Sequence, residues 1–122
     1  MILTTAARNA ACNAIVDLVD GGSGAGTIQF ETSGDAEVAT LTFSDPAFGS
    51  ASTGVATASA TTSDTSATGG TIAQASIYDS SSTKIWENTA GTSGTEFILS
   101  STSIGAGDTV SCSSFTVTVP AS

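Results

Sequence analysis

The chain has 122 residues, a length typical of one domain, and it carries two cationic side chains against eleven carboxylates, for a net charge of −9. This balance argues against binding to nucleic acid or to an anionic membrane surface, because both need clustered Lys and Arg. Ser, Thr, Ala and Gly make up more than half of the residues, so we expect a thin core. No apolar run approaches the ~20 residues of a membrane-spanning helix.

The N-terminal segment has the pattern of a short arm followed by a helix. Thr4 or Thr5 is a suitable N-cap, and Gly21-Gly22 is a typical helix end. Small and apolar residues recur between them at helical spacing, namely Ala6, Ala7, Ala10, Ala11, Ala14, Ile15, Leu18 and Val19. We expect this stripe to pack on the domain's own sheet, and docking on a neighbouring subunit is the alternative. Arg8 and the nearby asparagines argue against a secretion signal.

Two strands are predicted after the helix. Residues 27–32 place Ile28 and Phe30 on one face, and residues 37–43 alternate in the same way. The inward residues of the second strand are Ala39, Leu41 and Phe43. The following hexapeptide, residues 44–49 (SDPAFG), has turn chemistry, because Asp bonds the backbone ahead of it and Pro presets φ.

Further short strands are separated by turns rich in Gly, Ser and Asp. The predicted strands are residues 55–61, 71–79, 83–88 and 95–100. Residues 83–88 are expected to pair back on 71–79 as a hairpin, and residues 62–70 are expected to form a loop. The facing of residues 95–100 stays open, because Phe97, Ile98 and Leu99 are contiguous.

The C-terminal stretch, Ile104–Pro120, gives the clearest alternation in the chain. Its inward residues are predicted to be Phe115, Val117 and Val119. Val110 and Cys112 have the opposite parity, so we expect a β-bulge near Ser113-Ser114 to reconcile the two halves. Pro120 ends the strand, because it has no N–H to donate.

These elements together predict a mainly β fold. We expect an antiparallel β-sandwich or barrel-like domain of about seven short strands, preceded by one N-terminal α-helix. The division along the chain is a single domain over residues 1–122, with an N-terminal arm and helix in residues 1–22 and a β-domain in residues 27–120.

The sequence offers no set of residues for catalysis. It contains no His, no G-x-S-x-G motif and no phosphate loop, because Gly22–Gly26 lacks a Lys and a preceding strand. We therefore expect no enzyme, no catalytic residue, no metal site and no cofactor, although a calcium ion held by scattered Asp side chains stays open. Cys12 and Cys112 are expected to be two small buried thiols, with one disulfide as the alternative.

Three segments carry a resemblance to a known group of proteins. They are TTAARNAACNAIVDLVDGGSGAG, ATLTFSDPAFGSASTGVATASA and GTSGTEFILSSTSIGAGDTVSCSSFTVTVP. In this order they resemble small virion structural proteins of tailed bacteriophages, often called capsid-decoration or cement proteins. The most specific parts are LTFSDPAFG and the ending GDTV…SFTVTVP. Residues 71–78 are smaller and less aromatic than the pattern of that group.

The resemblance implies a protein that performs no reaction and binds an assembled capsid in many copies. Its partner would be the major capsid protein or another virion protein, and it would form a homo-oligomer on the capsid surface after synthesis in the host cytoplasm. We expect the contact residues to be Ile2, Leu3, Phe48 and Trp86. For Phe48 the alternative is a plug over the core edge, and for Trp86 it is hairpin packing. The alternative functions are a tail-tube or head–tail connector component and a carbohydrate- or cell-binding β module of a tail fibre.

Overall fold

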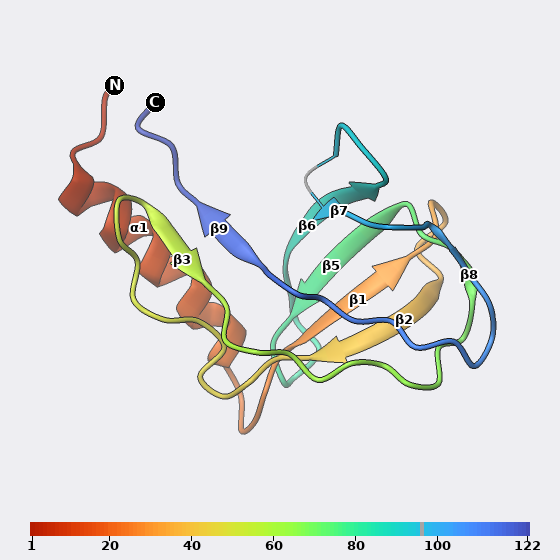
Figure 1. The fold of residues 1–122 in the computed structure, drawn as a ribbon. Coiled ribbons are helices and arrows are strands. Elements are labelled where there is room, and N and C mark those ends of the chain that lie inside the picture. The colour runs from red at the N-terminus through yellow and green to blue at the C-terminus, as the bar shows by residue number, and fades with distance from the viewer. Residues whose placement is uncertain (96) are drawn as a thin grey trace.

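The computed structural model describes residues 1–95 and 97–122, and it confirms a mainly β fold with one N-terminal helix. Helix α1 (Thr5–Asp17) continues into a short 3-10 turn, η1 (Leu18–Asp20). The strands are β1 (Thr27–Glu31), β2 (Glu37–Thr42), β3 (Val55–Thr57), β4 (Gly70–Thr71), β5 (Gln74–Tyr78), β6 (Lys84–Gly91), β7 (Phe97–Ile98), β8 (Ser103–Ile104) and β9 (Thr116–Thr118). The helix lies to one side of the sheets, and both termini lie at its outer end (Figure 1).

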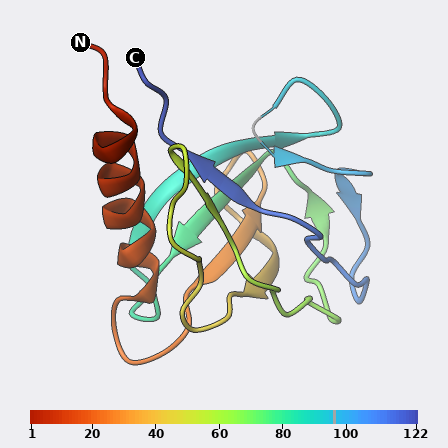
Figure 2. The same cartoon turned by 60° about the vertical axis from the view of Figure 1, so that its left-hand side comes forward.

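A five-stranded sheet in the order β2-β1-β5-β6-β7 forms the centre of the molecule. It curls around a core of inward side chains from alternate positions (Figure 2). The fully buried ones are Ile28, Phe30, Ala39, Leu41, Ala75 and Ile77. The strands predicted over residues 27–32 and 37–43 are confirmed as β1 and β2, and the predicted hairpin is confirmed by β5 and β6, with β5 also pairing antiparallel with β1. The strand predicted over residues 71–79 is interrupted, because residues 70–71 form β4, which pairs with β8 in a separate sheet, and β5 begins at Gln74. The strand predicted over residues 55–61 is shorter, because β3 ends at Thr57.

The segment after β6 differs from an all-antiparallel arrangement. Strand β7 runs parallel to β6, with Phe97 opposite Ala90 and Ile98 opposite Gly91. The ring of Phe97 packs edge-on against Phe30 at a centroid distance of 5.3 Å, whereas Ile98 is 61% exposed. The half-buried Phe97 ring, packed against Phe30, therefore gives the inward side of this segment, which the sequence left open.

The C-terminal stretch is a series of short pairings rather than one bulged strand. Val110 forms an isolated bridge with Asp64, and β9 is limited to three residues that pair with β3. The bulge predicted near Ser113-Ser114 is wrong, because the chain leaves one partner before it reaches the next and no ladder spans the change of parity. The alternation itself is confirmed, since Phe115 is buried while Thr116 and Thr118 are exposed.

The helix has the predicted cap but turns a different face to the body. Thr4 Oγ1 accepts a hydrogen bond from the N–H of Ala7 at 3.2 Å. The buried residues of the helical segment are Cys12, Val16 and Val19. Most of the predicted stripe is exposed instead, namely Ala6, Ala7, Ala10, Ala14, Ile15 and Leu18. The prediction that this stripe packs on the domain's own sheet is therefore wrong.

Polar side chains decide which helix face is turned inward. Oxygens of Asn9, Asn13 and Asp20 accept hydrogen bonds of 2.8 Å from the segment that precedes β3. Their backbone N–H donors belong to Gly54, Ala51 and Ala47 respectively. Arg8 Nε donates to the carbonyl of Val119 at 2.9 Å. An apolar stripe could not satisfy these backbone groups, so the helix turns its asparagine-bearing face to β3 and β9. Figure 2 shows the helix beside these two strands.

Candidate functional site

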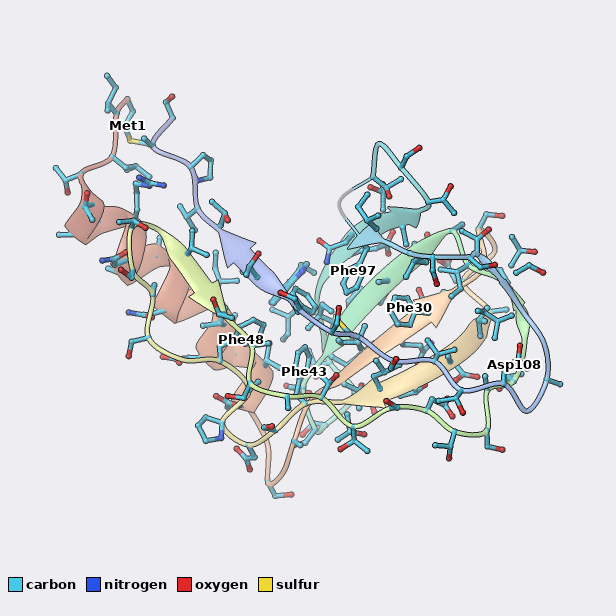
Figure 3. The ribbon with its side chains drawn as sticks, viewed as in Figure 1. Met1, Phe30, Phe43, Phe48, Phe97 and Asp108 are labelled. Carbon is cyan, nitrogen blue, oxygen red and sulfur yellow. The ribbon has the colours of Figure 1, made fainter. Side chains whose placement is uncertain are left out.

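The four predicted contact residues lie in different surroundings. Ile2 is 84% exposed, and Leu3 is half-buried where its N–H donates to the carbonyl of Ala121 at 2.7 Å. This arm lies at the tip of the molecule, where Figure 3 labels Met1, away from the labelled Phe30 and Phe97. Trp86 is half-buried on β6. The structure therefore does not bring the four residues together in one patch of the isolated chain.

Phe48 lies within an aromatic cluster of the core. It is 8% exposed, and its ring centroid lies 5.5 Å from that of Phe43 and 5.7 Å from that of Phe115. Figure 3 shows Phe43 and Phe48 close together beside the helix. In this conformation Phe48 offers a partner almost no area, as expected of a plug over the core edge.

Phe115 connects this cluster to the five-stranded sheet. Its ring lies 5.8 Å from Phe43, 6.4 Å from Trp86 and 5.0 Å from Phe97, measured between centroids. The contacts with Trp86 and Phe97 are edge-to-face, an arrangement that aromatic rings favour. A single buried ring thus holds the C-terminal stretch against β6 and β7.

A groove of about 990 Å³ lies beside this ring. We call it the β6 groove, and its main apolar lining residues are Trp86, Phe97, Ile98, Ile104, Phe115 and Val117. Ile15 from the exposed helix stripe also lines it. Among the described residues, none that lines the β6 groove carries a charge, although the whole chain has a net charge of −9. Serine and threonine side chains from residues 100–118 line it as well, so segments far apart in the sequence meet in one uncharged surface of mixed apolar and hydroxyl character.

The two edges of the five-stranded sheet differ in how far other segments cover them. The outer edge of β2 is covered, because Thr42 bridges Thr62 and the N–H of Gly69 donates to the carbonyl of Val38 at 3.1 Å. On β6, pairing with β7 is confined to Ala90 and Gly91 in the part of the chain that the structure describes. Thr89 also has a partner, so β7 and this contact leave at most the part of the β6 edge from Lys84 to Asn88 uncovered.

The two cysteines are free thiols, and the alternative of a disulfide is wrong. Cys12 is buried, and its Sγ donates to the carbonyl of Val117 at 3.4 Å. Cys112 is half-buried and lines the β6 groove, so it is more accessible than the sequence predicts. Burial raises the pKa of the Cys112 thiol above its ordinary value.

Alkylation with iodoacetamide near neutral pH should modify Cys112 slowly and leave Cys12 unmodified. The thiolate is the reacting form, so the raised pKa of Cys112 lowers its rate at neutral pH, and that rate should increase as the pH rises. Intact-mass spectrometry counts the adducts, and peptide mapping assigns them. The chain unfolded in guanidinium is the control and should gain an adduct at both cysteines. Rapid modification of native Cys12 would contradict its buried position.

A buried carboxyl group lies on the opposite face of the sheet. Glu31 is 1% exposed and accepts four hydrogen bonds from neighbouring side chains. The donors are Gln29 Nε2 at 2.8 Å, Gln74 Nε2 at 3.0 Å, Ser76 Oγ at 2.7 Å and Tyr78 OH at 3.3 Å. This convergence of donors explains how the carboxyl group is accommodated away from water.

Two exposed carboxylates lie next to Glu31. Glu31, Asp35 and Glu87 each place one oxygen within 4.8 Å of the others. Glu87 also forms an ion pair with Lys84 at 2.7 Å, and this hydrogen bond raises the pKa of Lys84. The three acids form the closest grouping of carboxylates that the described residues offer to a cation. The oxygens of Glu31 already accept hydrogen bonds from neighbouring side chains, so no bound cation is needed to explain this grouping.

Sequence reasoning found Trp86 but missed most of this surface. The contiguous Phe97, Ile98 and Leu99 carried the signal, because three adjacent apolar residues cannot all face one side of a strand.

No family model, curated protein or solved structure matches the chain. The helix is too short to cross a bilayer, and no other described helix is long and apolar enough to do so.

Proposed function

We propose that this chain is a virion structural protein of a tailed bacteriophage, a decoration or cement protein that binds the assembled head. The observation that supports this best is the uncharged β6 groove beside the edge of β6, on a chain with a net charge of −9. Such a surface provides contact area for another protein. The segments LTFSDPAFG and GDTV…SFTVTVP support the same class of protein by their resemblance.

The mechanism is stabilisation by mass action. A protein that binds the assembled shell and not its free subunits shifts the equilibrium toward the shell. Burying roughly 400 Å² of apolar surface at ~25 cal/mol per Å² contributes about 10 kcal/mol before the cost of association. Each copy therefore needs only a modest interface, because many copies act together on one particle.

Quantitative mass spectrometry of purified particles from the phage that encodes this chain tests the proposal. We expect hundreds of copies per particle, located on heads separated from tails. Particles assembled without the chain should lose their DNA at a lower temperature than complete particles. Absence from the particle, or only a handful of copies, would contradict a decoration role.

A tail-tube or head–tail connector component is the second candidate. The sparsely paired edge of β6 favours it, because strand edges join subunits into continuous rings and tubes. The same measurement separates the two functions. A connector or tube protein should be found with the tails, in tens to a few hundred copies, and should be absent from separated heads.

A further inference from the structure

The exposed large apolar side chains of this chain are concentrated on its N-terminal segment. Among the described residues they are Met1, Ile2, Ile15, Leu18 and Ile98, exposed by 100%, 84%, 38%, 56% and 61% respectively. Four of these five belong to the arm and the helical segment, and Ile98 lines the β6 groove together with Ile15. A concentration of exposed apolar side chains on one side of a molecule marks a place where another protein binds.

The outward side of the helical segment carries a ridge of apolar side chains. Ala6, Ala10, Ala14 and Leu18 recur every four residues, so they lie along one side of the helix, and all four are exposed. Figure 2 shows this helix at the outer flank of the molecule, with the sheets to one side of it. Because the contact positions are alanines, another helix can approach to about 8 Å between the two axes. The ridge therefore fits a second helix with an equally small face.

The charges of this face favour an identical face as its partner. Asp17 is the only charged side chain exposed on α1, although the chain carries eleven carboxylates. The first turn of α1 contains no acidic residue, so no side chain of its own offsets the partial positive charge of the helix N-terminus. In two antiparallel helices related by a two-fold axis at Ala10, Ala6 lies opposite Ala14, and Asp17 lies beside the N-terminal end of the other helix. Each copy then supplies a carboxylate where the dipole of the other helix favours one.

We propose that two copies of this chain form a two-fold dimer by antiparallel pairing of their α1 helices, with Ala10 at the axis. The same register places Ile2 of each copy beside Leu18 of the other, so the arm and the helix end cover one another. A two-fold contact uses the same surface on both copies, and it is the commonest form of homo-oligomer. The inference goes beyond the proposed function and does not depend on it, because it concerns the chain alone in solution.

Sedimentation equilibrium of the full chain measures the dimer directly. Helix α1 has 13 residues and spans about 20 Å, so the contact is smaller than the ~800 Å² per partner of a standard interface. We therefore expect a dissociation constant in the micromolar range. The measurement is made near physiological salt, which screens the repulsion between two chains that each have a net charge of −9.

Charged side chains at the two-fold axis test the position of the contact. Ala10→Glu and Ala10→Lys each place two like charges opposite one another, and each should raise the dissociation constant by at least about tenfold. An equimolar mixture of the two variants should dimerise again, because opposite charges then meet at the axis. Both substitutions introduce good helix formers at an exposed position, so the fold should be retained. Ala36→Glu is the matched control, because it adds the same charge at an exposed position outside the helix and should leave the dissociation constant unchanged.

Disulfide cross-linking tests the direction of the two helices. The chain with both Ile2→Cys and Leu18→Cys, and with Cys112→Ser to remove the accessible native thiol, should form a covalent dimer on mild oxidation. The two new cysteines of one chain lie at opposite ends of the helix, too far apart to bridge one another. Leu18→Cys alone, in the same background, should form no covalent dimer, because an antiparallel pair places the two Leu18 positions at opposite ends.

Three results would overturn the inference. They are a chain that stays monomeric at concentrations approaching ~1 mM, a dimer that folded Ala10→Glu leaves intact, and efficient cross-linking of Leu18→Cys alone, which requires parallel helices. A dimer that Ile98→Lys dissociates and Ala10→Glu does not would place the contact in the β6 groove instead. If the chain is monomeric but abundant on phage heads, the dimer inference fails and the proposed function stands.

Discussion

Replacing Phe115 with alanine is expected to lower the free energy of unfolding by about 4 kcal/mol, the usual range for deleting a buried Phe ring. The ring is buried among Phe43, Phe48 and Phe97 and touches Trp86 at its edge. Its loss removes these contacts and leaves a cavity that short, separately paired segments cannot easily close. Because small domains have total stabilities of about 5–15 kcal/mol, this single change should unfold a large share of the chain under mild denaturant.

Urea titration followed by circular dichroism measures the change. Phe115→Leu is the matched control, because it keeps an apolar side chain at the site, and we expect it to lose less than half as much stability. Leu18→Ala, at an exposed position of the helical segment, should change stability by less than ~0.5 kcal/mol. A loss of under ~1 kcal/mol for Phe115→Ala would mean that the sheet is stable without the C-terminal stretch.

The strands were predictable because their patterns are local. Alternation marks Ile28 and Phe30 as inward residues whatever lies on the other side of the core. Thr4 as a helix cap depends on a bond three residues away, and it too was predictable. Features that depend on residues far away in the sequence were not predictable. The helix face depends on backbone groups at Ala51 and Gly54, which the helix sequence does not reveal.

The candidate site was predictable only in part for the same reason. Trp86 stands out in any sequence that contains one Trp, but the groove around it forms where β6, β7 and the segment before β9 meet. Strand β7 runs parallel to β6, and its Phe97 packs against Phe30, a contact between residues 67 positions apart that no local pattern reveals. For Phe48 the sequence allowed either a contact residue or a plug over the core edge, and its 8% exposure fits the plug.

The burial of Glu31 was also not predictable from the local sequence. Its position in β1 continues the polar face that begins with Thr27 and Gln29, so the sequence places it in water. Three of its four donors come from β5, which lies more than forty residues further along the chain. The burial of this carboxyl group is therefore a property of the assembled sheet, and it makes Glu31 the most sensitive polar residue of that face.

Replacing Glu31 with alanine is expected to lower the free energy of unfolding by about 3 kcal/mol, because it leaves several donors without their acceptor, at ~1–3 kcal/mol for each buried group. Ser76 is fully buried and donates to Glu31 at 2.7 Å, so it cannot turn to water. Glu31→Gln keeps the shape but directs an NH₂ group at donors, and it should lose an intermediate amount. Glu87→Ala is the control for charge, because its exposed ion pair with Lys84 contributes no more than ~1 kcal/mol.

Thermal and urea unfolding of the three variants separates burial from charge. If the hydrogen bonds to Glu31 hold β1 and β5 together, stability should fall in the order Glu87→Ala, Glu31→Gln, Glu31→Ala, with the native circular dichroism spectrum retained at low temperature. Equal losses for Glu31→Ala and Glu87→Ala would instead mean that removing any carboxylate from the acidic face has the same effect. In that case the four donors around Glu31 would be satisfied by water as readily as by its oxygens.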